Sequence, residues 1–423
     1  MKPERLPGDA AAYVPETPPR VPATPEIVLD LTRLLSRVRH PTPTGVDRVE
    51  LLYARTLLAR APERLQFAAT HPLGSYGRLP SAAVLRFLDA TERRWNVIGG
   101  DERAGAAHRH LLASLASLWP RRVVPATRGR ILLHVSPSAL EDRRSVAKRL
   151  RRENARLICL VHDLIPLTHP SFARADGPRR HARRMISVAR HAHGVIANSS
   201  ATASAFTGWL NAAGEPVPKL AVAPLGAAAP ARARGAPPID QPYFLCLGTI
   251  EPRKNHLLLL HLWRQLSESA DGREIPKLVL IGRRGWENQS VFDLLDRSEP
   301  LRPHVVELGR VPDRVLAAWI AGASALLMPS FAEGFGLPVA ESLAAGTPVI
   351  ASDIPAHREA GRGVPDYLDS LDRPGWRQAI LDYAAPASPR REAQLARLSG
   401  AELPTWEDHI DRALAFIGEV AAS

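Results

Sequence analysis

The chain has 423 residues, of which 45% are hydrophobic, and a formal net charge of +12. This length predicts two or three domains, and the apolar content is enough for packed cores, which excludes a disordered chain. No apolar run reaches the roughly 18 residues of a membrane-spanning helix, and the first residues lack the apolar region of a signal peptide. The two cysteines, Cys159 and Cys246, lie in apolar runs. They exclude a disulfide scaffold or a cysteine-based zinc site and indicate a reducing compartment, so we expect a cytoplasmic protein.

The charge is unevenly distributed along the chain. Residues 1–240 contain 36 Lys and Arg against 19 Asp and Glu, whereas residues 241–423 contain 19 against 24. The basic first half predicts an anionic partner, such as nucleic acid, a membrane surface or a phosphorylated substrate. Base composition offers an alternative explanation. Only 5 of the 55 basic residues are Lys, as in proteins from GC-rich genomes, where Arg clusters carry less information.

From Glu26 onward, short apolar runs alternate with amphipathic stretches of helical length. Short apolar runs between turn signals indicate buried strands. The expected strands are Ile27–Leu31, Leu65–Thr70, Ile131–Val135, Leu157–Val161, Val195–Asn198, Leu220–Ala223, Tyr243–Leu247, Lys277–Ile281, Val305–Leu308, Ala325–Met328 and Pro348–Ala351. This alternation predicts an α/β protein whose parallel sheets carry helices on both faces.

A Pro- and Ala-rich segment, Ala227–Pro242, divides the pattern into two units. We therefore expect two doubly wound, Rossmann-like domains that face a central cleft. The amphipathic stretch Thr405–Ile417 predicts a last helix, which could pack back on the N-terminal domain. The expected boundaries are 1–25 for a flexible Pro-rich tail, 26–230 for the N-terminal domain, 231–242 for the linker, 243–403 for the C-terminal domain and 404–423 for the last helix.

Ligands of open parallel sheets bind beyond the carboxyl ends of the strands, so the loops there are the candidate site. The densest loop runs through ALLMPSFAEGFGLPVAE, which ends at Glu341. Pro338 suits the first position of a helix, which places Glu341 in its first turn and Glu333 on the loop before it. Two carboxylates beside the N–H groups of a helix start can hold a polyhydroxylated, phosphate-bearing ligand. The alternative is that Glu341 only complements the helix dipole and the glycines only shape a turn.

A second loop, LGTIEPRKNH at residues 247–256, follows the first strand of the C-terminal unit. Arg253 and Lys254 lie there just before a helix, and a neighbouring guanidinium and ammonium suit a diphosphate. Two cations at a helix start oppose the helix dipole, which argues against the alternative of a merely solvated helix start. We expect Lys254 at the surface of the cleft.

The N-terminal unit offers two candidates for the same cleft. The strand at 157–161 runs into His162, which is either a polar group for catalysis or a hydrogen-bonded structural histidine. The segment TPTGVDRV at 42–49 places Gly45 ahead of a helix, where the backbone can approach a ligand closely.

These motifs together resemble one family. EGFGLPVAE is similar to the Glu-x7-Glu motif of retaining glycosyltransferases with the GT-B fold, the large family 4 group known as glycosyl transferases group 1. GTIEPRKN resembles the diphosphate-binding loop of that group, and LVHDLIP, GVIANSSAT and VAPLG resemble its N-terminal strand ends. GRRGWEN, LGRVPD and PVIASDIPAHREAGR extend the resemblance, which covers roughly residues 26–420. TGVDRVE is like a segment of members that act on mannose- or deoxyhexose-containing bacterial polysaccharides.

The resemblance implies a role for each matching position. Glu341 would bind the ribose and Glu333 the transferred sugar, while Arg253 and Lys254 would hold the diphosphate. The implied catalytic residues are His162, Glu333, Arg253 and Lys254. The implied donor-binding residues are Gly45, Gly248, Thr249, Arg253, Lys254, Val311, Asp313, Glu333, Gly334, Phe335, Gly336, Leu337 and Glu341.

Two of these positions carry a qualification. Many members place an Arg directly after the Gly of the diphosphate loop, where this chain has Thr249. Asp313 lies in the implied base-binding turn and could accept hydrogen bonds from guanine, which favours GDP. It could equally be the N-cap of a helix.

The implied reaction is a retaining, metal-independent transfer of a hexose, with a mannose-like sugar favoured, from a nucleotide sugar to a saccharide in bacterial polysaccharide or glycolipid synthesis. No cofactor is implied beyond the nucleotide sugar as co-substrate, and no Asp-x-Asp sequence offers a metal clamp. Arg253, Lys254 and the helix N-terminal amides would stabilise the leaving diphosphate. The residues leave open the donor sugar and base, the acceptor, the linkage and the oligomeric state.

Two other classes of function stay open. Gly334-x-Gly336, with Asp353 after a later strand, resembles the fingerprint of a nicotinamide-dependent oxidoreductase. However, Val339 stands at the third glycine position, and several residues separate the strand from Gly334. A nucleic-acid-binding protein would suit the basic first half, but aromatic residues are only 5% and no binding module is recognisable, so we expect no nucleic acid partner.

The basic excess is concentrated in Arg143–Arg156 and Arg179–His193. If the second stretch is helical, Arg180 and Arg184 lie on a cationic side and Met185 and Ala189 on an apolar side. Such a helix can lie on an anionic membrane surface, which would suit a polyprenyl-linked saccharide acceptor and a peripheral position on the inner face of the cell membrane. The alternative is an ordinary helix with its apolar side in the core. In either case we expect the arginines to lie away from the cleft.

Overall fold

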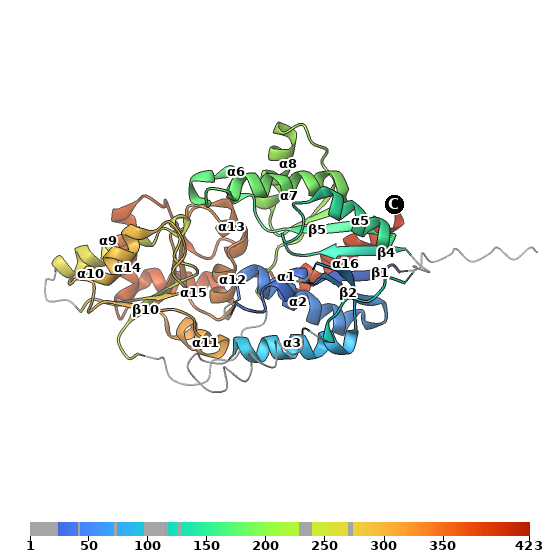
Figure 1. Cartoon of the computed structure of the whole chain (residues 1–423). Coiled ribbons are helices and arrows are strands. Elements are labelled where there is room, and N and C mark those ends of the chain that lie inside the picture. The colour runs from blue at the N-terminus through green and yellow to red at the C-terminus, as the bar shows by residue number, and fades with distance from the viewer. Residues whose placement is uncertain are drawn as a thin grey trace, which may run out of the picture.

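The chain folds into two α/β domains, each built on one sheet (Figure 1). A cleft lies between the domains. The computed structural model of the chain describes residues 24–40, 43–71, 74–96, 115, 117–124, 129–227, 239–269 and 274–423. Most of the predicted tail and linker, and Thr42 of the segment before Gly45, lie outside these residues.

The first domain has a seven-stranded sheet in the order β3-β2-β1-β4-β5-β6-β7. Its strands are β1 (Glu26–Asp30), β2 (Leu65–Thr70), β3 (Tyr76–Leu79), β4 (Arg130–His134), β5 (Arg156–Val161), β6 (Ala192–Ala197) and β7 (Lys219–Val222). Its helices include α1 (Thr32–Ser36), α2 (Gly45–Arg60), α3 (Ser81–Trp95), α5 (Arg143–Glu153), α6 (Ile165–Thr168), α7 (Gly177–His191) and α8 (Ser200–Ala212). The central strands are buried on both faces, which explains why their sequences are continuous apolar runs.

The second domain has a six-stranded parallel sheet in the order β10-β9-β8-β11-β12-β13. Its strands are β8 (Tyr243–Leu247), β9 (Lys277–Ile281), β10 (Val305–Leu308), β11 (Ala325–Met328), β12 (Val349–Ser352) and β13 (Asp366–Leu368). Its helices include α9 (His256–Glu268), α10 (Gln289–Arg297), α11 (Asp313–Gly322), α12 (Leu337–Ala344), α13 (Pro355–Gly361), α14 (Arg373–Ala384) and α15 (Pro389–Ser399). In both sheets the strand order reverses next to the first strand, as in doubly wound folds.

All the predicted strands are present, with their ends shifted by three residues at most, and the α/β fold class is confirmed. Two strands, β3 and β13, were not predicted. The sheets are parallel as predicted except at β3, which pairs antiparallel with β2. Its sequence YGRL carries no apolar run, and Gly77 is needed because a Cβ there would lie 2.2 Å from the carbonyl oxygen of Arg121.

The last helix, α16 (Trp406–Ala422), crosses back to the first domain, so the C-terminus lies beside that domain in Figure 1. It contacts β4, β5, β6 and β7. A Cβ at Gly194 of β6 would lie 2.7 Å from the Phe416 ring, so glycine lets the helix approach the sheet closely. The chain is tied where it crosses, because Ala227 and Thr405 form a parallel bridge.

The two domains also touch beside the cleft. The Gly334 carbonyl in the second domain accepts hydrogen bonds from Ser199 Oγ at 2.6 Å and Thr202 Oγ1 at 3.1 Å in the first. The Glu359 carboxylate accepts from the backbone N–H of Ser200, at 2.7 and 2.9 Å. The carboxyl ends of the two sheets are thereby held facing each other.

Candidate functional site

A cleft of about 780 Å³ lies between the domains at the carboxyl ends of both sheets. The first domain lines it with the start of α2 and the loops after β5 and β6. The second domain lines it with the loops after β8, β9, β10 and β11. This volume and position are typical of small-molecule sites in α/β proteins.

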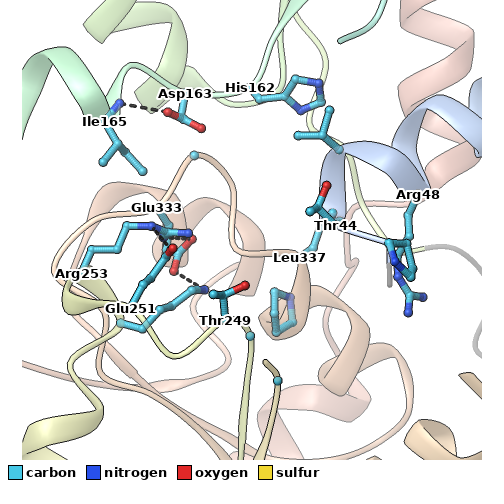
Figure 2. A pocket seen from close by; sticks show the side chains of 18 of the residues that line it. Thr44, Arg48, His162, Asp163, Ile165, Thr249, Glu251, Arg253, Glu333 and Leu337 are labelled. Atoms are coloured by element: carbon cyan, nitrogen blue, oxygen red, sulfur yellow. Dashed lines mark hydrogen bonds and ion pairs between the residues drawn. The ribbon is translucent and has the colours of Figure 1, made fainter. Parts of the chain in front are cut away.

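Four charged side chains meet on the second-domain wall of the cleft. Arg253 Nη1 lies 2.8 Å from Glu333 Oε2, and Arg253 Nε lies 2.6 Å from Glu251 Oε1. Lys254 Nζ lies 2.6 Å from Glu333 Oε1. Figure 2 shows Arg253, Glu251 and Glu333 side by side, with Asp163 and His162 of the first domain across the cleft. We call Glu251, Arg253, Lys254 and Glu333 the charged cluster.

Burial and charge act against each other on Glu333. Burial raises the pKa of its carboxyl, but the positive charges of Arg253 and Lys254 outweigh burial and hold this pKa well below its usual range. Glu333 is therefore ionised at neutral pH. Burial has the larger effect on Glu251 and raises the pKa of its carboxyl.

Lys254 lines the cleft but is not at its surface as expected, because only 6% of the residue is exposed. It ends the 3₁₀ turn Pro252–Lys254, and Asn255 with a φ of 54° then turns the chain into α9. A lysine buried this deeply requires a paired carboxylate, which Glu333 provides.

The loop between β11 and α12 forms the wall that carries Glu333. A Cβ at Gly334 would lie 2.1 Å from the carbonyl oxygen of His162, so a glycine is needed where the domains meet. Gly336, with a φ of 95°, is the N-cap of α12, and the left-handed backbone there also favours glycine. Phe335 between them is buried, which fixes the loop in the core.

Glu341 is not in the first turn of α12, as expected, but in the second. The helix begins at Leu337, one residue before Pro338. The effect of the helix dipole falls off within the first turn, so a role in complementing the dipole is a poor explanation for this carboxylate. Glu341 lines the cleft, and burial raises its pKa, an effect that the nearby Arg48 opposes.

His162 follows β5 and lines the cleft. Its Nε2–H donates to the Val135 carbonyl at 2.8 Å. Burial lowers the pKa of His162, although this hydrogen bond and Asp163 oppose the shift. The ring is therefore neutral at pH 7, with Nδ1 as the remaining acceptor. His162 is thus hydrogen-bonded within its domain, as the structural expectation states, and it also lines the cleft, while its role in catalysis stays a prediction.

Asp313 does not reach the cleft, but Val311 two residues earlier lines it. The Asp313 carboxylate pairs with Arg48 Nη2 of α2 across the domain boundary, at 2.6 Å. The alternative that Asp313 caps a helix is wrong, because Pro312 is the N-cap of α11. Figure 2 shows Arg48 on α2, the helix for which Thr44 is the N-cap.

Every other predicted site residue lines the cleft. Gly45 begins α2 behind a capping box formed by Thr44 and Asp47, and a Cβ at Gly45 would lie 3.8 Å from Leu337 Cδ1 of the opposite domain. The predicted site residues that line the cleft are Gly45, His162, Gly248, Thr249, Arg253, Lys254, Val311, Glu333, Gly334, Phe335, Gly336, Leu337 and Glu341.

Sequence reasoning missed Glu251, which stands within the loop motif itself as the only carboxylate there. It also misplaced Arg180 and Arg184. Both line the cleft, where they pair with Glu141. Their expected position away from the cleft is wrong because the packing of α7 on the sheet, which no residue spacing reveals, sets how that helix is rotated.

The apolar side of α7 is in the core. Met185, Val188 and Ala189 are at most 5% exposed and pack in the hydrophobic core of the first domain. This favours the ordinary amphipathic helix over one that inserts apolar side chains into a membrane. No helix among the described residues is both long and apolar enough to cross a bilayer.

The geometry argues against a dinucleotide fingerprint. β11 ends at Met328 while α12 begins only at Leu337, so the tight strand-to-helix turn is missing. Asp353 pairs with Arg358 at the surface and does not line the cleft. Within the described ranges, we find no group of three or more His, Cys, Asp or Glu side chains that could hold a metal ion.

Comparison with known proteins finds similarity to one family of enzymes. Residues 230–362 match the sequence model described as glycosyl transferases group 1. Among curated proteins, the chain is 28% identical over 263 residues to the serotype-specific mannosyltransferase WbdA of Escherichia coli, covering 57% of this chain and 32% of that protein. It is 34% identical over 168 residues to the O-antigen chain mannosyltransferase B of the same species, covering 40% and 43%. The chain thus spans less than half the length of these relatives.

The fold has close counterparts among solved structures. An α,α-trehalose 6-phosphate synthase from Burkholderia multivorans aligns with a TM-score of 0.60 at 13% identity, covering 94% of this chain and 99% of that one. A sucrose-phosphate synthase from Thermosynechococcus elongatus aligns with a TM-score of 0.59 at 17% identity, covering 94% and 99%. The resemblance found in the motifs is confirmed: residues 230–362 are similar to the glycosyl transferases group 1, and the chain has the GT-B fold.

Proposed function

We propose that the protein is a glycosyltransferase that moves a hexose from a nucleotide sugar to a saccharide acceptor in bacterial polysaccharide or glycolipid synthesis. The observation that carries the proposal is the charged cluster at the carboxyl ends of the second sheet. Cations beside a helix N-terminus suit a diphosphate, and carboxylates suit sugar hydroxyls. The relatives named as O-antigen mannosyltransferases support hexose transfer in polysaccharide synthesis.

In the proposed reaction the transferred sugar keeps its anomeric configuration and no metal ion takes part. The acceptor oxygen attacks the anomeric carbon on the face that the diphosphate leaves. Arg253, Lys254 and the N–H groups at the start of α12 stabilise the charge that develops on the leaving diphosphate. Glu333 orients the sugar, His162 contacts it near the anomeric carbon, and Glu341 binds the ribose.

The proposed donor is a GDP-sugar with a mannose-like hexose. The names of the relatives support the sugar. The proposal of a guanine base rests on Asp313 alone, which pairs with Arg48 and does not line the cleft. Recognition of guanine by Asp313 therefore requires this pair to open and the carboxylate to turn toward the cleft.

The proposed acceptor is a saccharide carried on a polyprenyl diphosphate, presented at the inner face of the cell membrane to a cytoplasmic enzyme. Arg180 and Arg184, which line the cleft and share the single carboxylate of Glu141, supply positive charge for an anionic acceptor. Contact with an anionic membrane surface would be electrostatic, because the apolar side of α7 is packed in the core.

The experiment is a panel of GDP-, UDP-, dTDP- and ADP-sugars, scored by thermal shift and by release of nucleoside diphosphate in excess EDTA. The proposal predicts that one nucleotide sugar stabilises the protein and is slowly hydrolysed without metal, and that GDP-mannose is that donor. Stabilisation by none of the four contradicts glycosyl transfer. Activity that EDTA abolishes and Mg²⁺ or Mn²⁺ restores contradicts only metal independence.

A further inference from the structure

The charged cluster is balanced within itself. Arg253 and Lys254 lie 2.6–2.8 Å from the carboxylates of Glu251 and Glu333, so two positive charges meet two negative ones. A nucleoside diphosphate brings several further negative charges into the cleft. Because charge interactions are strong where water is displaced, an additional cation beside the cluster would favour binding.

Arg283 lies beside the diphosphate loop. β8 and β9 are parallel neighbours in which Leu247 pairs with Ile281. The ladder continues past the strand ends, because the Ile250 N–H donates to the Arg283 carbonyl at 2.9 Å. The same register puts Arg283 opposite Thr249, and both residues line the cleft.

Glycines bring these two loops into backbone contact. A Cβ at Gly282 would lie 1.8 Å from the Gly248 carbonyl oxygen. Nothing larger than glycine fits at residue 282, so the residue that follows it is held against the loop that carries Thr249.

Two adjacent arginines differ in their partners. Arg284 pairs with Asp296 at 2.6 Å and with Glu307 at 2.7 Å on the outer surface. Arg283 is exposed and lines the cleft, and within the described part of the chain its guanidinium forms no ion pair or hydrogen bond.

The positive charge of Arg283 also acts on a residue of the first domain. Burial, and after it the positive charges of Arg37 and Arg283, lower the pKa of His40 in the first domain. Charge interactions weaken with distance and with screening by salt. Arg283 therefore lines the cleft on the second-domain side and is close enough to the first domain for its charge to act there.

We infer that Arg283 is a further diphosphate-binding residue, which supplies the positive charge that the balanced cluster lacks. This inference rests on the proposed function, because it presumes a nucleoside diphosphate in the cleft. According to this inference Arg283 binds the ligand, whereas Arg284, one residue later, stabilises the fold through its ion pairs.

The test is calorimetric titration of the protein with GDP, UDP, ADP and dTDP, followed by the variants with whichever binds most tightly. Arg283→Ala is expected to weaken binding of that diphosphate about 10- to 100-fold, the range for losing a charge-assisted hydrogen bond. Affinity for the parent nucleoside, which lacks phosphates, should stay within about twofold of wild type. Arg284→Ala is the matched control and should bind the diphosphate as wild type does.

The outcomes separate the inference from the proposed function. If the wild-type protein binds none of the four diphosphates, the proposed function fails and the inference with it. If it binds one and Arg283→Ala binds that one equally well, the inference alone is wrong. Equal weakening of nucleoside and diphosphate also overturns it, because the effect is then structural. Arg283→Gln, which removes the charge but keeps a polar side chain, decides the matter should Arg283→Ala not fold.

Discussion

Because of the environment of Lys254, a substitution there should affect both activity and stability. It is buried and bonded to Glu333 at 2.6 Å, so it serves both the fold and the cleft. Lys254→Ala is expected to lower kcat about 10²- to 10³-fold, as for removal of one preorganised donor. It should also lower the free energy of unfolding by about 1–3 kcal/mol, since Glu333 loses one of two partners.

Steady-state kinetics and urea unfolding measure the two effects on Lys254→Ala. Lys277→Ala is the control, because Lys277 is at the surface and donates to the Pro303 carbonyl. A folded Lys254→Ala protein with wild-type kcat would contradict the role of Lys254 in the transfer reaction.

Glu333 should make stability depend on pH in the acid range. Its pKa is depressed in the folded protein by Arg253 and Lys254, against the effect of burial. An unfolded Glu titrates near pH ~4.3, so this stabilisation is complete above that value and is lost as the pH falls through the folded pKa. Glu333→Gln should thus cost stability at pH 7 and progressively less below about pH 4.

Glu341 supplies a control of opposite sign, because burial raises its pKa. Its contribution is present below the unfolded pKa and is lost as the pH rises through the folded one, so Glu341→Gln should stabilise the unliganded protein at pH 7. Urea unfolding at pH 7, 5 and 4 measures both variants. Parallel pH curves for wild type and Glu333→Gln would show that the buried ion pairs do not form.

At the scale of elements, α7 divides its arginines between two surroundings. Arg180 and Arg184 line the cleft and pair with Glu141, whereas Arg179 and Arg183 are exposed and do not line it. We expect Arg180→Gln/Arg184→Gln to reduce transfer to an anionic acceptor and to spare hydrolysis of the donor. Arg179→Gln/Arg183→Gln should change neither reaction but should weaken binding to vesicles of anionic lipid at low salt.

Flotation with anionic vesicles and the two activity assays distinguish these variants. If wild-type protein does not float with the vesicles even at low salt, electrostatic membrane contact is excluded. If both pairs of substitutions have the same effects, the proposed difference in role between the cleft-lining and the exposed arginines of α7 is wrong.

α16 ties the second domain to the first through Phe416, which is 4% exposed and packs over Gly194. Phe416→Ala should lower the free energy of unfolding by about 3–5 kcal/mol, the range for removing a buried aromatic ring. Glu407→Ala, an exposed change on the same helix, is its control in denaturant titrations. A loss below about 1 kcal/mol would mean that α16 does not pack on the sheet as described.

At the scale of the whole molecule, the sequence predicts what is local. Strands such as Tyr243–Leu247 are continuous apolar runs, and the loops that follow them carry motifs. For this reason every predicted site residue except Asp313 lines the cleft. Contacts between distant residues could not. No spacing reveals that Glu333 neutralises Lys254, and the rotation of α7 depends on the packing of Met185.

The short antiparallel strand β3 shows the same limit for the fold. Its edge position and its single partner are set by the sheet, not by an apolar pattern in YGRL. Asp313 shows it for the site, because its partner Arg48 comes from the other domain.

The central claim is that the cleft transfers hexose from a nucleotide sugar with retention and without metal. The most direct measurement is ¹H NMR of the anomeric proton during turnover of GDP-mannose in excess EDTA, with Glu333→Gln as the inactive comparison. The account predicts that the wild-type protein consumes the donor and that the first-formed product keeps the α configuration of the donor. A first-formed product with the β configuration would contradict it. So would wild-type protein that consumes none of the GDP-, UDP-, dTDP- and ADP-sugars.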